Sequence, residues 1–390
     1  MRIGFFHESA GTKHAGGIAI YLQYMAAELS KSHDVYLYTQ EGSPTALLRD
    51  SAVTIVPMPG ISDRIATAIT TLSPAGRQDI NSLAMVGRGV GNDLIEHIET
   101  NTDVLITFIW LDDLLLSNLV DVPTVYGFHR IDIEGFGGRL RDTHSQTRTI
   151  LANTERTAER ITEVFDRTVD GVAYPGIDPD QFNPAVPPAF ESDEPAVLFV
   201  GRVQEQKGVF DLVNAVGDVD TDCTVHVVGA GRTEALRETA WSAGIGDSVR
   251  IHGEIPHDEL PGYYTAVDVF CLPSYVESFG MANLEAMACG TPVVSGRLAP
   301  IESYLTHGVH GHLVEPGDTE ELAAVLERLL TSPEERLRLG ANALERSKTY
   351  TWDNQATVLE AVCAQAVATD DEMEVENTEG AREVPQSTFR

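Results

Sequence analysis

Two carboxylates that could take part in substrate binding, Glu277 and Glu285, lie eight positions apart in the chain. Residues 267–272 before them are mostly apolar and rich in strand formers, whereas 281–289 are good helix formers followed by a glycine. The pattern predicts Glu277 in a strand-to-helix turn and Glu285 about one turn inside the helix. Unpaired backbone N–H groups at a helix N-terminus suit a phosphate, and a nearby carboxylate can accept hydrogen bonds from sugar hydroxyls. The segment therefore predicts a site for a nucleotide-linked sugar.

Spacing alone is weak evidence, because an acidic chain produces such pairs by chance. Glu155 and Glu163 have the same separation, as do Glu327 and Glu335. Both pairs lie in helical patterns, where charged residues usually form a solvated face. Only the pair at 277 and 285 flanks a predicted turn, so the context carries the prediction.

The composition predicts a globular protein of two domains with an acidic surface. The chain has 390 residues, 43% of them hydrophobic, and 59 acidic against 27 basic residues give a net charge of −32. Such a surface repels nucleic acid and anionic lipid at low salt. We interpret it as a halophilic adaptation to a saline cytoplasm, where charge repulsion reaches only about 3 Å at 1 M salt. The four lysines are Lys13, Lys31, Lys207 and Lys348.

The ends and apolar stretches of the sequence predict a cytoplasmic protein. Residues 1–6 form a strand pattern with no apolar signal region or cleavage site. The most apolar stretch, 104–116, is interrupted by Asp112 and Asp113 and is too short to span a bilayer. The cysteines have neither metal-ligand spacing nor a disulfide framework, which predicts buried thiols in a reducing compartment. They are Cys223, Cys271, Cys289 and Cys363.

Short apolar strands alternate with helical segments along the chain, which predicts parallel sheets covered by helices. The proline- and glycine-rich stretch 174–194 reads as a linker between two such units. Ligands of open parallel sheets bind beyond the carboxyl ends of the strands, so we expect two Rossmann-like domains facing across a cleft. The predicted parts are 1–185, 186–350, a helix at 351–368 that crosses back to the first domain, and an acidic, disordered tail at 369–390.

Two cations follow the predicted strand 197–200. Arg202 and Lys207 lie in a turn that leads into a helix, where a planar guanidinium and a point charge match a diphosphate. The alternative is that Arg202 forms an ordinary ion pair with Glu205.

Two weaker motifs follow strands of the first domain. Gly16 and Gly17 precede a helix and would allow backbone to approach a phosphate, although a plain turn explains them equally well. His129 follows the strand 122–126 and could bind a sugar hydroxyl, carry a proton or be structural. In the second domain, 229–231 lacks the third glycine of a dinucleotide fingerprint, so we expect no nicotinamide cofactor.

The combined motifs resemble the family-4 glycosyltransferases, retaining enzymes of the GT-B fold that take a sugar from a nucleotide diphosphate donor. The resemblance covers most of the chain, and its specificity lies in the order and spacing of modest motifs. The matching pieces are Gly16-Gly17, His129, Asn153, Pro175-Gly176-Ile177-Asp178, Gly201-Arg202, Lys207-Gly208, Glu277-Ser278-Phe279-Gly280, 285–294 and 308–318.

The resemblance implies a donor side in the second domain and an acceptor side in the first. Arg202 and Lys207 would bind the donor diphosphate, Glu285 would hold the ribose hydroxyls, and Glu277 would face the donor sugar. From the first domain, Gly16 and Gly17 would approach the phosphate and His129 would reach the donor sugar. Backbone amides that would meet phosphate and sugar belong to Phe279, Gly280, Met281 and Ala282.

The family implies transfer with retention at the anomeric carbon. Because the sequence offers no convincing nucleophile, we favour front-face attack in which the departing diphosphate helps to take the acceptor's proton, with Arg202 and Lys207 stabilising its charge. Glu277 then has a positioning and electrostatic role. Asp-x-Asp strings at 178–180 and 218–220 are expected by chance in so acidic a chain, so we predict no essential metal and no cofactor.

The chain departs from the family pattern on the acceptor side. Arg130 stands where many members have an acidic residue, and seven arginines lie between 130 and 167. This region could meet a phosphorylated acceptor or a lipid headgroup at the inner membrane face, or it could be an ordinary ion-paired helix. The acceptor could be a glycan, a lipid-linked molecule or a small molecule. Two rival functions share the fold: a nucleotide-sugar 2-epimerase and a non-catalytic nucleotide-sugar binding protein.

Overall fold

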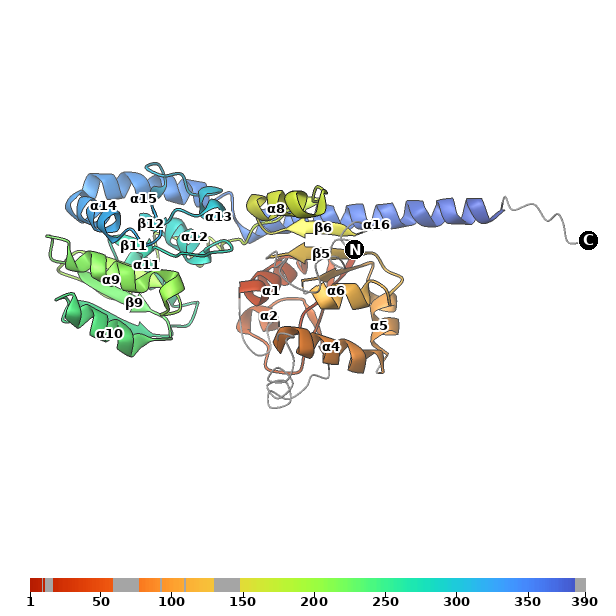
Figure 1. Cartoon of the computed structure of the whole chain (residues 1–390). Helices are drawn as coiled ribbons and strands as arrows, with labels where there is room; N and C mark the ends of the chain where they lie inside the picture. Colours follow the sequence, from red (N-terminus) through yellow and green to blue (C-terminus); the bar gives the residue numbers. More distant parts are fainter. Residues whose placement is uncertain are drawn as a thin grey trace, which may run out of the picture. The chain divides into compact units, whose positions relative to one another are not determined.

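The computed structural model divides into two compact units (Figure 1). Unit 1 comprises Met1–Tyr174 with Trp352–Arg390, and unit 2 comprises Pro175–Thr351. The structure describes residues 1–8, 10, 17–58, 77–91, 93–108, 110–129 and 148–382, without the side chains of 77–83, 110–111 and 371–382.

Unit 1 is built on a seven-stranded parallel sheet in the order β3-β2-β1-β4-β5-β6-β7. The central strand β1 pairs with β2 and β4, so that Ile3 lies between Val35 and Val104. Helices cover the sheet, and its inner strands β1, β4 and β5 are apolar runs in which nearly every residue is buried. The strands are β1 (Arg2–Phe6), β2 (Asp34–Gln40), β3 (Thr54–Met58), β4 (Val104–Thr107), β5 (Thr124–Phe128), β6 (Thr149–Ala152) and β7 (Gly171–Val172).

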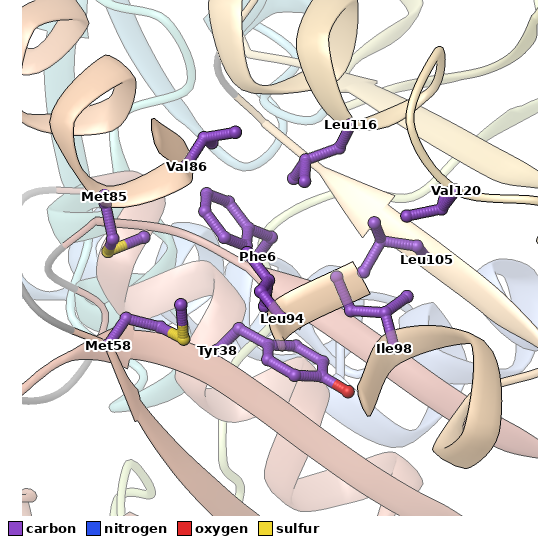
Figure 2. Close-up of a cluster of buried hydrophobic side chains, with 10 residues drawn as sticks. All are labelled: Phe6, Tyr38, Met58, Met85, Val86, Leu94, Ile98, Leu105, Leu116 and Val120. Atoms are coloured by element: carbon purple, nitrogen blue, oxygen red, sulfur yellow. The ribbon is translucent and has the colours of Figure 1, made fainter. Parts of the chain in front are cut away.

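The helices of unit 1 enclose an apolar core (Figure 2). Phe6 of β1 and Tyr38 of β2 lie in this core with methionine, leucine and isoleucine side chains of α4 and α5. The described helices are α1 (Gly17–Leu29), α2 (Ala46–Asp50), α4 (Arg77–Val90), α5 (Leu94–Asn101), α6 (Trp110–Leu116), α8 (Glu155–Phe165) and α16 (Trp352–Arg382).

Unit 2 has a six-stranded parallel sheet in the order β10-β9-β8-β11-β12-β13. Its strands are β8 (Ala196–Val200), β9 (Thr224–Val228), β10 (Val249–Gly253), β11 (Val269–Leu272), β12 (Val293–Gly296) and β13 (Gly311–Val314). Its helices are the 3-10 turn η1 (Glu205–Lys207), α9 (Val209–Gly217), α10 (Thr233–Ser242), α11 (Leu260–Thr265), α12 (Met281–Ala288), α13 (Ala299–Glu302), α14 (Thr319–Thr331) and α15 (Pro333–Ser347). The predicted pair of Rossmann-like domains is confirmed.

The boundary between the units differs from the predicted one at 185/186. It falls after Tyr174, because the following segment packs on unit 2. The amide of Ile177 donates to the carbonyl of Tyr350 at 2.7 Å, and the buried Phe182 ring lies 6.2 Å from the ring of Tyr264. Proline-rich composition marked a connection but could not show which unit the connection packs against.

The last helix, α16, belongs to unit 1. Trp352 stacks on Tyr24 of α1 at 4.8 Å, and Leu359 and Cys363 are buried. The predicted end of this helix at 368 and the predicted disorder from 369 are corrected for residues 369–382, which continue the helix. Extending an existing helix needs no new nucleation, and the glutamates and methionine of this segment are good helix formers. Residues 383–390 of the predicted tail lie outside the described part.

Within the described residues, no helix has the length and apolarity needed to cross a membrane.

Candidate active site

The turn after β8 places Lys207 beside the end of β11. Gly208 has φ +69, and a side chain there would collide with the carbonyl oxygen of Pro273, 2.1 Å from the position of its Cβ. Only glycine combines this backbone conformation with so close an approach. The sequence therefore brings the end of η1 into contact with the segment that carries Glu277.

Lys207 and Glu277 form an ion pair, with Nζ 2.5 Å from Oε1. The hydroxyl of Ser274 donates to the same carboxylate oxygen at 2.9 Å. The Glu277 side chain is 8% exposed and that of Lys207 20%, so the pair is largely shielded from bulk solvent. The structure thus brings together two of the predicted site residues, one cation and one carboxylate, at the carboxyl edge of the sheet.

Arg202 lies on the same turn and is exposed. Among the described residues it forms no ion pair, because Glu205, its suggested partner, pairs with Arg232 instead. The alternative of a structural Arg202–Glu205 pair is therefore wrong. A guanidinium at the carboxyl edge of the sheet is available for an anion.

The predicted strand-to-helix turn ends at the N-terminus of α12. Gly280 is the N-cap residue with φ 85, and Met281 and Ala282 form the start of the helix, where backbone N–H groups have no intrahelical acceptor. The buried Tyr304 hydroxyl donates to the carbonyl of Phe279 at 2.9 Å. This hydrogen bond fixes the turn so that its amides have defined directions.

Glu285 lies in the second turn of α12, as the pattern predicted, and is 4% exposed. The Tyr264 hydroxyl donates to its Oε2 at 2.6 Å, and Nε2 of His257 lies 2.9 Å from Oε1. Neither partner was a candidate from the sequence. They come from α11 and from the loop after β10, and no local motif marks either of them.

In unit 1, His129 follows β5 and packs against the rings of Tyr21 at 4.6 Å and Phe108 at 5.3 Å. Burial of the imidazole lowers the pKa of His129 to about 3, with a smaller contribution from His7. The ring is therefore neutral near pH 7. It can donate and accept hydrogen bonds but does not act there as a cation.

Asn153, at the end of β6, sets the tautomer of this ring. The hydroxyl of Thr157 donates to Oδ1 of Asn153 at 2.8 Å, which turns the amide nitrogen toward Nδ1 of His129 at 3.4 Å. A neutral ring that accepts at Nδ1 carries its proton on Nε2. His129 thus presents an N–H donor at the carboxyl edge of the unit 1 sheet.

The remaining predicted residues of unit 1 are placed in part. Gly17 is the first residue of α1, and a side chain built there would meet no atom within 4 Å. Gly16 lies outside the described residues, as do Arg130, Arg139 and Arg141.

The described arginines between 148 and 167 all have partners, which favours the ordinary helix-face interpretation for them. Arg156 and Arg160 of α8 pair with Glu159 and Glu163 on the same helix. The guanidinium of Arg167 pairs with Asp170 and that of Arg148 donates to the carbonyl of Ser117. The membrane or acceptor role of this region stays a prediction.

In the part of the chain that is described, no group of three His, Cys, Asp or Glu side chains is placed to hold a metal ion. The first Asp-x-Asp string forms a local turn, in which Asp178 accepts from the amide of Asp180 at 2.9 Å. The expectation of a metal-independent reaction stays a prediction.

Comparisons with known proteins give this geometry a family context. Residues 182–346, nearly all of unit 2, match the family model described as "Glycosyl transferases group 1". A "D-inositol 3-phosphate glycosyltransferase" of Xylanimonas cellulosilytica is 29% identical over 92% of this chain and 94% of its own length. The chain is a glycosyltransferase.

Solved structures agree with the fold of this glycosyltransferase. Sucrose-phosphate synthase of Thermosynechococcus elongatus has a TM-score of 0.73 at 21% identity and covers 94% of this chain and 99% of its own. Anabaena HepE, solved in complex with UDP and glucose, has a TM-score of 0.72 at 19% identity. The match covers 94% of this chain and 100% of the HepE chain. The fold of the glycosyltransferase is therefore the GT-B fold.

Proposed function

We propose that this glycosyltransferase moves a sugar from a nucleoside diphosphate donor to a hydroxyl of the acceptor with retention at the anomeric carbon. The observation that carries the proposal is the arrangement at the carboxyl edge of unit 2. Lys207 is paired with Glu277, Arg202 has no ion-pair partner among the described residues, and the α12 N-terminus follows. Two cations and a helix N-terminus suit a diphosphate.

In this proposal Arg202 and Lys207 stabilise the negative charge that grows on the departing diphosphate, and amides of the Phe279–Ala282 segment add hydrogen bonds. Glu277 keeps Lys207 in place, and its carboxylate accepts a hydrogen bond from a hydroxyl of the donor sugar. Its shared contacts with Lys207 and Ser274 favour positioning over attack on the sugar. The acceptor's proton passes to the departing diphosphate, so no separate protein base is needed.

Unit 1 contributes His129 as a neutral donor to a substrate hydroxyl. Burial lowers the pKa of His129 to about 3, which favours a hydrogen-bonding role over general acid catalysis near neutral pH. Gly16 and Gly17 remain in the proposal as points where backbone approaches phosphate.

The names of the relatives suggest which class of acceptor to test first. Several are named for D-inositol 3-phosphate, a phosphorylated cyclitol, so this class comes first and glycan or lipid-linked acceptors follow. Action at an inner membrane face stays part of the proposal only for the lipid-linked case, and binding to anionic liposomes in high salt would test it.

The function is tested by incubating the protein with a panel of nucleotide sugars, with and without D-inositol 3-phosphate, and analysing the products by mass and by NMR of the anomeric proton. Transfer releases the nucleoside diphosphate and leaves the anomeric configuration unchanged. An altered free sugar nucleotide would instead show epimerisation, and binding with no product would show a sensor. An inverted product would exclude the retaining mechanism.

A further inference from the structure

The carboxylate of Glu285 is held from two directions by side chains of unit 2. Tyr264 donates to one oxygen at 2.6 Å, and His257 contacts the other at 2.9 Å. A carboxylate that is only 4% exposed requires such partners, because burying its charge without them is costly. Among the described residues, no lysine or arginine forms an ion pair with it.

The two partners differ in their access to solvent. Tyr264 is fully buried, and burial, together with the charge of Glu285, raises the pKa of its hydroxyl well above the ordinary value. It is a permanent neutral donor. The His257 side chain is 34% exposed. Of the two partners of the Glu285 carboxylate, His257 is therefore the one that is exposed to solvent.

His257 is also the charged partner. Burial acts to lower the pKa of His257, but the hydrogen bond and charge of Glu285, with a smaller contribution from Asp258, raise it overall. The imidazolium is therefore retained to higher pH than in an unpaired histidine. As an imidazolium its Nε2–H donates to the carboxylate, a charge-assisted hydrogen bond.

The position of the His257 ring is set by packing as well as by this bond. The buried ring of Phe182 lies 5.1 Å from the imidazole, and the side-chain amide of Gln181 donates to the His257 backbone carbonyl at 3.2 Å. The loop follows β10, so His257 lies at the same carboxyl edge of the sheet as the turn of Arg202 and Lys207.

We propose that His257 is a positioning residue for the nucleotide, which holds Oε1 of Glu285 so that the remaining lone pairs of the carboxylate accept the ribose hydroxyls. A carboxylate has about four acceptor sites, and the contacts to Tyr264 and His257 use two of them. The imidazolium also adds a positive charge at the edge where the diphosphate is proposed to bind. This inference rests on the proposed function, because it assigns a residue to the same donor site.

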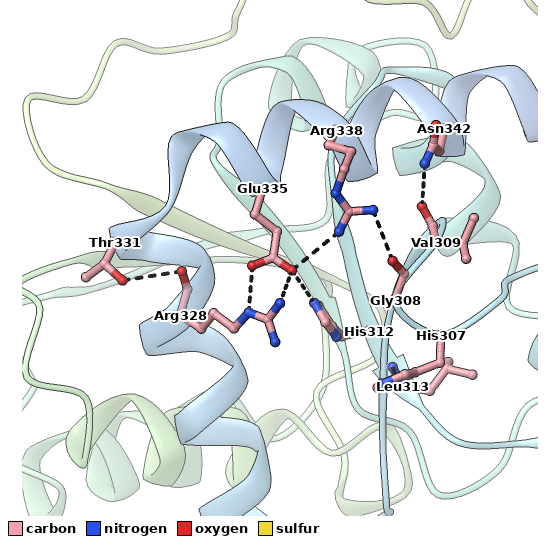
Figure 3. A network of polar contacts seen from close by, with 10 residues as sticks. All are labelled: His307, Gly308, Val309, His312, Leu313, Arg328, Thr331, Glu335, Arg338 and Asn342. Atoms are coloured by element: carbon pink, nitrogen blue, oxygen red, sulfur yellow. Dashed lines mark hydrogen bonds and ion pairs between the residues drawn. The ribbon is translucent and has the colours of Figure 1, made fainter.

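A second histidine–glutamate pair in unit 2 provides a matched control (Figure 3). Nε2 of His312 lies 3.2 Å from Oε1 of Glu335, but this carboxylate also pairs with Arg328 at 2.6 Å and Arg338 at 3.6 Å. Burial lowers the pKa of His312, and this effect is larger than the opposing effect of the Glu335 carboxylate, which raises it. His312 lies in β13 and its partner in α15, so this histidine–glutamate contact lies in the same unit but outside the donor-site elements.

The test measures the dissociation constants of UDP, GDP and ADP by calorimetry at pH 5.5 and 8.5 in molar salt. The variants are His257→Phe, which keeps a ring against Phe182, His257→Gln, which keeps a neutral donor, and His312→Gln. For the nucleotide that the wild type binds, we expect His257→Phe to weaken binding about tenfold at pH 5.5, the loss of one charge-assisted hydrogen bond.

The pH dependence separates positioning from a purely structural role. The groups that act on His257 are Glu285 of α12 and Asp258 of its own loop, with Tyr264 bound to the same carboxylate, and only the imidazole ordinarily titrates in this range. Because its pKa is raised, the proton is present at pH 5.5 and is lost as the pH rises. The ratio of the His257→Gln constant to the wild-type constant should therefore fall toward one at pH 8.5. Because both constants are measured with the same nucleotide at the same pH, the effect of phosphate titration on binding cancels in this ratio.

Unchanged nucleotide binding in both His257 variants would overturn the inference, even if they melted at lower temperature. An equal loss in His312→Gln would overturn it as well, because the effect would then be general. If the wild type bound none of the three nucleotides, the proposed function would fail first.

Discussion

At the residue scale, the ion pair between Lys207 and Glu277 is the centre of the proposed donor site. Each side chain is largely shielded, so removal of one leaves the other charge without its partner. Ser274, which shares the carboxylate, limits the orientations that Glu277 can adopt. In the proposed mechanism the lysine therefore has an electrostatic role and the glutamate a positioning role.

Replacing Lys207 or Glu277 by Ala should lower turnover at least about a hundredfold, because each removes a group that stabilises or orients the reacting charge. Steady-state release of nucleoside diphosphate measures this, and circular dichroism checks that the fold is kept. Lys348→Ala is the matched control. Lys348 caps the C-terminus of α15 and forms an exposed ion pair with Glu345 of that helix. Turnover near the wild-type level in either site variant would refute the roles assigned here.

Some of the site could be predicted from residue types and spacing, and some could not. Arg202, Lys207 and Glu277 follow strands, and Glu285 lies in the helix after the turn of Glu277, so local patterns located them. Their partners Ser274, Tyr264 and His257 have no such marker, because long-range packing decides which side chains meet a buried carboxylate. The same holds for the Thr157–Asn153 contact that fixes the His129 tautomer.

At the element scale, the turn between β8 and α9 depends on a close backbone approach. Gly208 and Gly244 both have positive φ, +69 and +80, but only Gly208 faces a backbone atom, the carbonyl oxygen of Pro273. A side chain at Gly244 would meet nothing within 4 Å. The two glycines therefore separate the cost of backbone strain from the cost of a collision.

Gly208→Ala should displace η1 and reduce both turnover and melting temperature, whereas Gly244→Ala should cost only the strain of its conformation, about 1 kcal/mol. Thermal denaturation and nucleoside diphosphate release, measured on both variants, make the comparison. Equal losses in the two variants would show that the contact with Pro273 does not hold the turn.

The alternation of apolar and helical segments was sufficient to predict two parallel sheets, since parallel strands buried on two faces give continuous apolar runs. It did not mark β3, β7 or β13 as strands. It could not place the boundary at Tyr174, or the helical state of 369–382. Those depend on the packing of Phe182 and on extension of α16 from its buried half.

At the scale of the whole molecule, a net charge of −32 acts against the compact state through self-repulsion. Screening at molar salt reduces the range of this repulsion to about 3 Å. Many exposed acids already pair locally, as Glu163 does with Arg156 and Arg160 on α8, and such surface pairs contribute little. Salt should therefore stabilise this chain rather than weaken it.

We expect the melting temperature, followed by circular dichroism, to rise between dilute buffer and molar potassium chloride. Sucrose at equal osmolality is the control for general solvent effects. A fold with the same melting temperature in dilute buffer and molar salt would exclude the halophilic interpretation of the composition.

If the carboxyl edge of unit 2 holds a diphosphate through Arg202 and Lys207, loss of Arg202 should weaken binding of a nucleoside diphosphate more than binding of its monophosphate. Calorimetry would compare a nucleoside diphosphate with its monophosphate, for the base that the wild type prefers, in the wild type and in Arg202→Ala. We expect the wild type to bind the diphosphate at least about tenfold more tightly than the monophosphate, and Arg202→Ala to lose most of this preference. A preference for the diphosphate that is as strong in Arg202→Ala as in the wild type would contradict this expectation.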